Sequence, residues 1–210
     1  MTAPSSRLSR SFQRLAGAAL AVAGLAATGT ASAGDFLDLR PGTVYAAANL
    51  NLLQANGYEC EGSPICERPR IGGKLFGGYR FTPNLATEVA YYYLGSFKSV
   101  DTGVTAPGDA ADTKLRNTAV SIGIDWHNEL FQVLYQHIRF GVAVVRTDGR
   151  IIYGDNRTER VNEYTTVPYL GLGLSYQFNP HVRFYQGYDI LRNKRNNHIH
   201  VLSMGVGIEN

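Results

Sequence analysis

The stretch "YLGLGLSYQF", residues 169–178, alternates between two kinds of side chain. Its even-numbered positions are apolar or aromatic: Leu170, Leu172, Leu174, Tyr176 and Phe178. The odd-numbered positions carry two glycines, a serine, a glutamine and one tyrosine. Because successive side chains of a β-strand point to opposite faces, this pattern predicts a strand between an apolar and a polar environment. Whether the apolar face meets a protein core or lipid decides the fold.

The first 33 residues have the layout of a secretory signal peptide. Three arginines precede a run of Leu, Ala, Val and Gly that is too short and too rich in alanine for a membrane anchor, and "TASA" ends at Ala33. Removing these arginines from the 20 Lys and Arg leaves 17, equal to the 17 Asp and Glu, so the charge does not indicate nucleic-acid binding. We expect a signal peptide over residues 1–33, a short lead over residues 34–42 and one domain over residues 43–210.

The two cysteines lie six positions apart in "CEGSPIC". In an exported protein this spacing favours a disulfide between Cys60 and Cys66 that closes a short loop. A metal site would need further ligands, and the stretch offers only Glu59, Glu61 and Glu67 beside the thiols. We therefore expect neither a metal site nor a cofactor here.

The period of two recurs along the chain and gives eight expected strands. They cover residues 43–53, 70–81, 85–97, 116–127, 131–146, 164–178, 182–191 and 198–208. Tight turns are expected at residues 82–84, 127–129 and 179–181, and longer polar connections at residues 54–70, 98–115, 147–163 and 192–197. Short and long connections alternate, which predicts an antiparallel meander with one trimmed end.

Two all-β folds accept eight such strands: a soluble periplasmic, lipocalin-like barrel that binds an apolar ligand, and an outer-membrane barrel with an apolar exterior. The polar face combines charges with many glycines, which weaken a strand exposed to water but make room in a narrow lumen. On the apolar face, aromatic residues such as Phe97, Trp126 and Tyr176 gather toward strand ends, as in membrane girdles. We therefore predict an all-β fold, an eight-stranded antiparallel up-and-down transmembrane β-barrel, with the soluble barrel as the alternative.

Charged residues on the polar face would then lie inside the barrel, where charges of both signs must pair. The expected lumen charge network consists of Lys74, Arg80, Glu88, Asp125, Arg139, Arg183 and Asp189. Glu88, Asp125 and Asp189 are the carboxylates available to the four cations. Since eight strands leave an interior that side chains can fill, we expect this network to pack the lumen and stiffen the barrel.

The segment "KLFGGYRFTPNLATEVAYYYLGSF", residues 74–97, follows the cysteine loop and resembles the small outer-membrane β-barrel family that includes the transmembrane domain of outer membrane protein A and the opacity-type surface proteins. The similarity covers residues 43–208. It implies a location in the bacterial outer membrane, periplasmic turns, surface loops and a role in envelope integrity or surface contact. We expect no peptidoglycan-binding domain of the kind that larger members carry, and "GIEN" stands where members usually end on an aromatic residue recognised during assembly.

An outer-membrane lipid A esterase is the enzymatic alternative, because His198, His200 and Ser203 share the last expected strand. Positions 200 and 203 fall on opposite faces, and no carboxylate is placed to orient either histidine, so we expect no enzyme. The basic loop with Arg192, Lys194 and Arg195 is suited to lipopolysaccharide phosphates. The expected partners are outer-membrane lipid and lipopolysaccharide, the barrel-assembly machinery and a host or cell-surface ligand, for a monomer.

Overall fold

The structure, a computed structural model, describes residues 42–55, 65–67, 70–100, 110–192 and 198–210. The strands are β1 (Val44–Ala55), β2 (Ile65–Glu67), β3 (Ile71–Thr82), β4 (Leu85–Val100), β5 (Ala110–Phe131), β6 (Leu134–Tyr153), β7 (Thr158–Asn179), β8 (Val182–Arg192) and β9 (His198–Glu209). The described ranges contain no helix long and apolar enough to cross a membrane.

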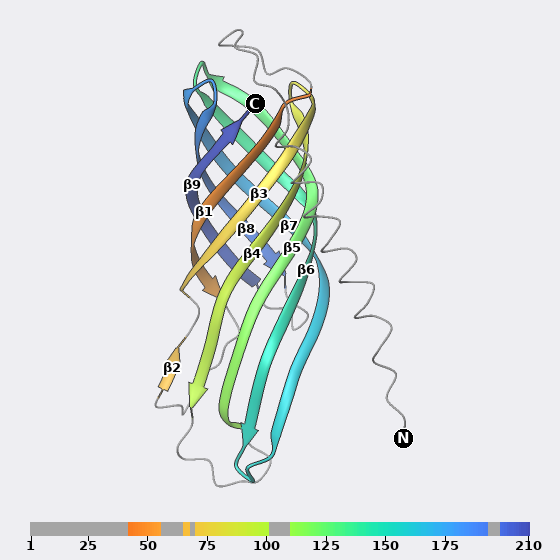
Figure 1. Cartoon of the computed structure of the whole chain (residues 1–210), viewed down its shortest axis with the longest axis vertical. Helices are drawn as coiled ribbons and strands as arrows, with labels where there is room; N and C mark the ends of the chain where they lie inside the picture. Colours follow the sequence, from red (N-terminus) through yellow and green to blue (C-terminus); the bar gives the residue numbers. More distant parts are fainter. Residues whose placement is uncertain (1–41, 56–64, 68–69, 101–109, 193–197) are drawn as a thin grey trace.

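The eight longer strands form a closed antiparallel ring (Figure 1). Each pairs with its neighbours along the chain, and β1 closes the ring by pairing with β9 from Tyr45↔Glu209 to Ala55↔Ile199. The short β2 lies outside the ring and, among the described strands, pairs with the far end of β4. The predicted eight-stranded antiparallel barrel is thus confirmed, and closure leaves no unpaired sheet edge in the ring.

One end of the barrel is short and the other is extended. The β3–β4, β5–β6 and β7–β8 turns and the C-terminus gather at the short end, whereas β4, β5, β6 and β7 continue well past the other strands at the opposite end (Figure 1). Outer-membrane barrels carry short periplasmic turns and longer extracellular connections. We call the protruding part of β4–β7 the outer extension.

The outer extension is built partly from residues within two segments, 98–115 and 147–163, that were expected to be loops. Residues 98–100 and 110–115 belong to β4 and β5, and residues 147–153 and 158–163 belong to β6 and β7, which pair out to Ile152↔Thr158. These segments lack a clear period of two because, beyond the lipid, both faces of a strand can meet water. Alternation therefore marked only the membrane-spanning part of each strand.

The expected turn at residues 127–129 was also wrong. His127 lies within β5 opposite His137 of β6, and the chain reverses at residues 132–133. Residues 127–129, whose polarity suggested a turn, all belong to β5, and His127 faces the interior of the barrel. In an inside-out barrel, a polar side chain does not mark the end of a strand.

Phe97 is the third correction, because it lies inside rather than on the apolar exterior. The ladder between β4 and β5 shifts register between Tyr93 and Ser96, and Gly95 in this bulge has a φ of 74°. An extra residue in one strand reverses the facing of all that follow it. Glycine adopts this left-handed conformation without steric cost.

The exterior of the ring is apolar. Leu50, Ile71 and Ile208 are 73%, 69% and 66% exposed, and the even positions of "YLGLGLSYQF" also point outward. Along β7 this band runs from Tyr164 to Tyr176, which is about 40 Å along the strand, or about 28 Å along the membrane normal at a tilt of about 45°. A soluble barrel would carry its apolar face inside, so the lipocalin-like alternative was wrong.

Candidate functional site

Glycines of β7 and β8 make room for the central charges of the interior. Gly171 lies opposite Arg139 of β6 and Asp189 of β8, and a Cβ added to it would collide with Asp189 Oδ1. A Cβ on Gly173 would lie 3.1 Å from Arg139 Nη2, and one on Gly187 would collide with the same atom. The guanidinium therefore occupies space that side chains at these three positions would fill.

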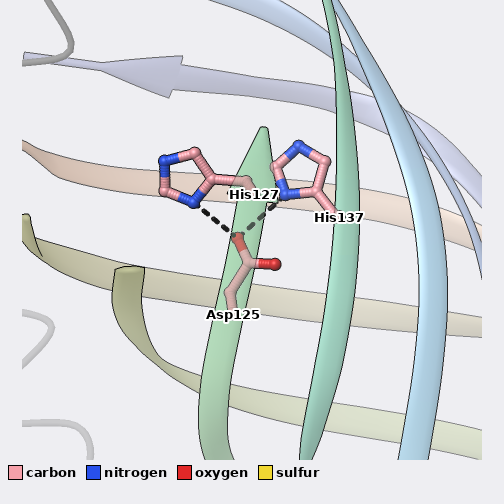
Figure 2. A group of neighbouring side chains, drawn as sticks. All are labelled: Asp125, His127 and His137. Atoms are coloured by element: carbon pink, nitrogen blue, oxygen red, sulfur yellow. Dashed lines mark hydrogen bonds and ion pairs between the residues drawn. The ribbon is translucent and has the colours of Figure 1, made fainter. Parts of the chain in front are cut away.

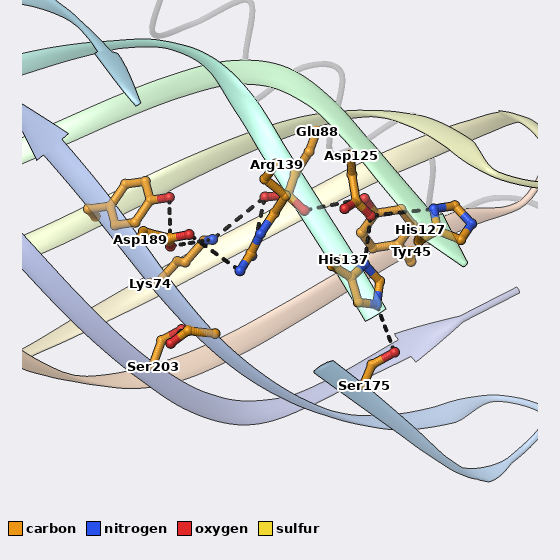
Figure 3. A network of polar contacts seen from close by, with 12 residues as sticks. Tyr45, Lys74, Glu88, Asp125, His127, His137, Arg139, Ser175, Asp189 and Ser203 are labelled. Carbon is orange, nitrogen blue, oxygen red and sulfur yellow. Dashed lines mark hydrogen bonds and ion pairs between the residues drawn. The ribbon is translucent and has the colours of Figure 1, made fainter. Parts of the chain in front are cut away.

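The central cluster consists of Lys74, Glu88, Arg139 and Asp189, all buried (Figure 3). Lys74 Nζ lies 3.0 Å from Asp189 Oδ2 and 3.6 Å from Glu88 Oε1. Arg139 completes the ring, with Nη2 3.3 Å from Asp189 Oδ1 and Nη1 3.8 Å from Glu88 Oε1. Two cations and two carboxylates thus alternate across the lumen, and Tyr92 donates a further hydrogen bond of 3.1 Å to Asp189.

A second cluster near the short end joins Arg80 and Arg183 to Glu209 of β9. Arg183 Nε lies 2.7 Å from Glu209 Oε2, and Arg80 forms an ion pair with the other carboxylate oxygen. The expected partners of these arginines were the three carboxylates named from the sequence. The structure pairs them instead with Glu209, which stands next to the final residue and whose side chain lies almost buried in the barrel.

A third cluster surrounds Asp125 (Figure 2). Asp125 Oδ2 lies 2.8 Å from His137 Nδ1 and 3.5 Å from His127 Nδ1. His137 Nε2 is in turn 2.8 Å from Ser175 Oγ on β7. All four residues are buried, and the two imidazole rings are stacked with centroids 5.7 Å apart. The order of carboxylate, imidazole and hydroxyl matches that of a hydrolase triad.

The structure therefore buries all seven residues of the expected network but divides them among three clusters. Sequence reasoning missed Glu209, His127, His137 and Ser175 as members. Both histidines occupy polar-face positions of the alternating pattern, and correct placement of the β5–β6 turn would have set them opposite each other. No local signal in the sequence identifies Glu209, because its partners come from β3 and β8.

The outward face of the outer extension carries a row of basic residues. In register across β4, β5, β6 and β7 stand Lys98, Lys114, Arg150 and Arg160, which we call the basic ladder. At the β2 edge the backbone register continues to Glu67. Lys114, Arg150 and Arg160 are exposed, and no ion pair joins any of these three to a side chain that the structure describes.

The rows nearer the lipid add to this positive charge. Arg116 lies two positions from Lys114 on the same face, and Arg146 sits over the ring of Tyr164, 5.6 Å from its centroid. The one acid among them is Asp148, which is 3.4 Å from Arg146. The basic face thus begins at the aromatic residue that ends the apolar band of β7.

The tip of the β6–β7 hairpin is fastened by local contacts. Tyr153 donates a 2.6 Å hydrogen bond to Glu159 Oε2, which raises the pKa of the Tyr153 hydroxyl. Arg157 stacks on the same ring at 4.5 Å. Asn156 turns the chain with a φ of 62°, a conformation that asparagine tolerates. The β6–β7 hairpin of the outer extension is therefore held together by local contacts up to its tip.

The remaining expected sites are placed as follows. Cys60, Lys194 and Arg195 lie outside the described residues, as do the side chains of Cys66 and Arg192. Ser203 faces the interior, whereas His200 lies on the other face, where its Nδ1 is 2.6 Å from the Tyr188 hydroxyl. The pair considered for an esterase is therefore split across the barrel wall.

The sequence matches the OmpA-like transmembrane domain over residues 42–206. The chain belongs to this family. Members of this family are β-barrels of the bacterial outer membrane. The apolar band is therefore the lipid-facing surface, and the short turns are periplasmic. The resemblance of residues 43–208 to this family is thereby confirmed. A sequence comparison with curated proteins found no match.

Solved structures share the fold at low sequence identity. OprG from Pseudomonas aeruginosa has a TM-score of 0.61 at 10% identity, over 84% of this chain and 99% of that one. Neisserial surface protein A has a TM-score of 0.53 at 18% identity, over 80% and 98%. Ail, the attachment invasion locus protein of Yersinia pestis, has a TM-score of 0.52 at 12% identity, over 81% and 100%. These likenesses support the fold of this OmpA-like barrel.

Proposed function

We propose that this OmpA-like barrel is a non-enzymatic surface-contact protein whose basic ladder binds the anionic groups of glycans. The observation that carries the proposal is the register of Lys98, Lys114, Arg150 and Arg160. Like charges directly opposite each other destabilise a sheet, so four in a row call for a compensating ligand. Closely spaced cations match a chain of sulfate or phosphate esters.

The position of the ladder fits this class of ligand. It lies four residues beyond Tyr164 along β7, or about 13 Å along the strand, on the face that continues the lipid-facing surface. Lipopolysaccharide of the same membrane and a sulfated glycan of another cell can both present anions there. Ail, which shares the fold, is described in complex with the heparin analogue sucrose octasulfate.

The packing of the interior is that of a rigid, filled barrel rather than a wide channel. The central cluster crosses the lumen with Lys74 and Arg139 between two carboxylates, and Phe76 and Tyr185 pack edge to face at 5.2 Å. Such ion-paired packing suits a role in envelope integrity as a rigid base for the outer extension. Ring closure also removes free edges within the lipid, which is consistent with a monomer inserted by the barrel-assembly machinery.

The hydroxyl of Ser175 is poorly suited to act as a nucleophile. The residue is buried near the C-terminal end of β7 and pairs with Tyr135 on one side and Tyr185 on the other. Backbone amides in a strand paired on both sides serve the ladder, so they cannot stabilise an oxyanion. Incubation of the purified barrel with lipid A should release no fatty acid; release that is lost in Ser175→Ala or Ser203→Ala would contradict the non-enzymatic proposal.

The binding test compares two double variants of equal charge. Lys114→Gln/Arg150→Gln removes the centre of the ladder, whereas Arg70→Gln/Arg157→Gln removes two exposed cations outside it. We expect the first to weaken binding to immobilised heparin by about tenfold or more at physiological salt, and the second by about twofold or less. Lipopolysaccharide micelles form the second arm and show which anionic glycan the ladder prefers. Equal losses in both variants, or binding to neither glycan, would overturn the proposal.

A further inference from the structure

The third interior cluster has the composition of a metal site. Asp125 and His127 stand two positions apart on β5 and so share a face, and the β5–β6 register places His137 directly opposite His127. One ligand atom from each of the three residues lies within 4.8 Å of the others. Figure 2 shows both imidazoles turned toward the same carboxylate from adjacent strands. Two imidazoles and one carboxylate are a common ligand set for zinc and for first-row transition metals.

The distances suit a shared ion. Nitrogen and oxygen ligands at about 2.1 Å from a tetrahedral metal lie about 3.4 Å apart. Asp125 Oδ2 is 2.8 Å from His137 Nδ1 and 3.5 Å from His127 Nδ1. Modest side-chain rotation would bring the three atoms around one centre, because the strand pairing already fixes their Cα positions.

Two of the ligands have unused bonding capacity. Neither ring nitrogen of His127 makes a hydrogen bond to a described residue, although the side chain is completely buried; Nδ1 has only the 3.5 Å ion-pair contact with Asp125 Oδ2. Asp125 Oδ1 is likewise without one. Buried polar groups are normally satisfied, and an unsatisfied one costs free energy. A metal ion bound to Nδ1 of His127 would satisfy one of these three atoms.

The surroundings provide support of the kind that metal ligands need. His137 would bind through Nδ1, and its Nε2 is 2.8 Å from Ser175 Oγ, which fixes the orientation of the ring. Among the four interior carboxylates of the described chain, only Asp125 has no Lys or Arg within ion-pair distance. The nearby Arg139 is directed at Glu88 and Asp189.

We propose that Asp125, His127 and His137 form an internal binding site for a first-row transition-metal dication such as Zn²⁺. The imidazoles favour such ions over Mg²⁺ and Ca²⁺, which prefer oxygen ligands. The ion would join β5 to β6 near the periplasmic turn. It would add a cross-link at a point where the interior otherwise contains buried polar atoms without a hydrogen bond.

The test removes all other histidines first. The chain has five, so His181→Gln/His198→Gln/His200→Gln leaves only His127 and His137 and eliminates the pair on the outside of β9, whose rings lie 6.2 Å apart. This triple variant is refolded into detergent micelles with Zn²⁺ present, since the site is enclosed, and is then freed of loose metal by gel filtration. We expect about one equivalent of Zn²⁺ per chain by elemental analysis.

The decisive comparison adds His127→Gln to the triple variant. Because the ring nitrogens of His127 make no hydrogen bond to a described residue, this change should leave the barrel folded, as judged by heat-modifiable gel mobility. We expect the amount of retained Zn²⁺ to fall by about tenfold or more. When the triple variant is loaded with Co²⁺ instead, the visible absorption of the cobalt ion bound by nitrogen and oxygen ligands should disappear on adding His127→Gln. A triple variant that folds but retains no Zn²⁺ would overturn the proposal. An equal Zn²⁺ content per chain with and without His127 would also overturn it. If the triple variant fails to fold, a loss of one equivalent between the native chain and His127→Gln decides the same question.

Discussion

Gly171 and Asp189 face each other across the β7–β8 ladder, and the missing side chain of Gly171 leaves the space that the Asp189 carboxylate fills. A Cβ at this position would also lie 3.3 Å from Arg139 Nε. The glycine is therefore part of the charge cluster although it makes no ion pair. The same strand presents Leu170 and Leu172 to the lipid, so "YLGLGLSYQF" combines a lipid-facing surface with space for an interior network.

Gly171→Ala should destabilise the barrel by about 1–3 kcal/mol, because the added methyl group forces the buried carboxylate and guanidinium apart. Denaturant unfolding of the refolded protein, followed by tryptophan fluorescence and gel mobility, measures the change. Gly73→Ala is the matched control, since its nearest heavy atom would be Asn49 O at 3.8 Å. Equal stability of the two variants would show that the space at Gly171 is not required.

Asp189→Asn should cost more, about 3–5 kcal/mol, because it removes one member of a buried ion-paired cluster and leaves the others uncompensated. Asp189 is the shared partner of Lys74, Arg139 and Tyr92. Asp148→Asn removes the same charge from an exposed pair with Arg146 and should change the stability by less than about 1 kcal/mol. A loss at Asp189 no larger than the loss at Asp148 would contradict the structural role of the central cluster.

The fold could be predicted from the sequence because lipid imposes a strict rule on every strand that crosses it. Leu170, Leu172 and Leu174 must face outward, and the interior must receive the alternate positions. The rule lapses outside the lipid, so residues 98–115 and 147–163 gave no periodic signal although much of each is strand. The bulge at Gly95 was also hidden, since one inserted residue reverses facing without altering the local composition.

The site was predictable only in part for a related reason. Facing is a local property, so burial of Lys74 or Asp189 follows from the pattern of its own strand. Pairing depends on register between strands, and that depends on where each turn lies. Misplacing the β5–β6 turn by five residues kept His127 and His137 apart, and the Glu209 pairs required knowledge of how β9 closes the ring.

Leu170→Arg tests the assignment of the lipid-facing surface. Leu170 lies midway between Tyr164 and Tyr176 on the exterior of β7, so a charge there should cost about 2–4 kcal/mol in a bilayer. Asn162→Arg places the same side chain on the same face of the same strand, but in the outer extension, where water solvates it. Unfolding in lipid vesicles should separate the two variants, and comparable stabilities would mean that the membrane boundary is misplaced.

The basic ladder should carry a cost in the absence of ligand, which Arg150→Thr would reveal. Arg150 stands between Lys114 and Arg160 across two ladders, so its removal relieves two like-charge contacts, each of about 0.2–1 kcal/mol. Threonine also has a high strand propensity, which could stabilise the sheet by itself. Salt separates this effect from the relief of charge repulsion, because screening weakens only the repulsion. Amide hydrogen exchange across residues 112–116 and 148–152 should therefore slow in Arg150→Thr at low salt, and the difference should shrink at high salt. Asn162→Thr, a neutral change one row nearer the lipid, should show no such dependence. Slower exchange that persists unchanged at high salt would attribute the effect to strand propensity and remove the electrostatic reason for a glycan ligand.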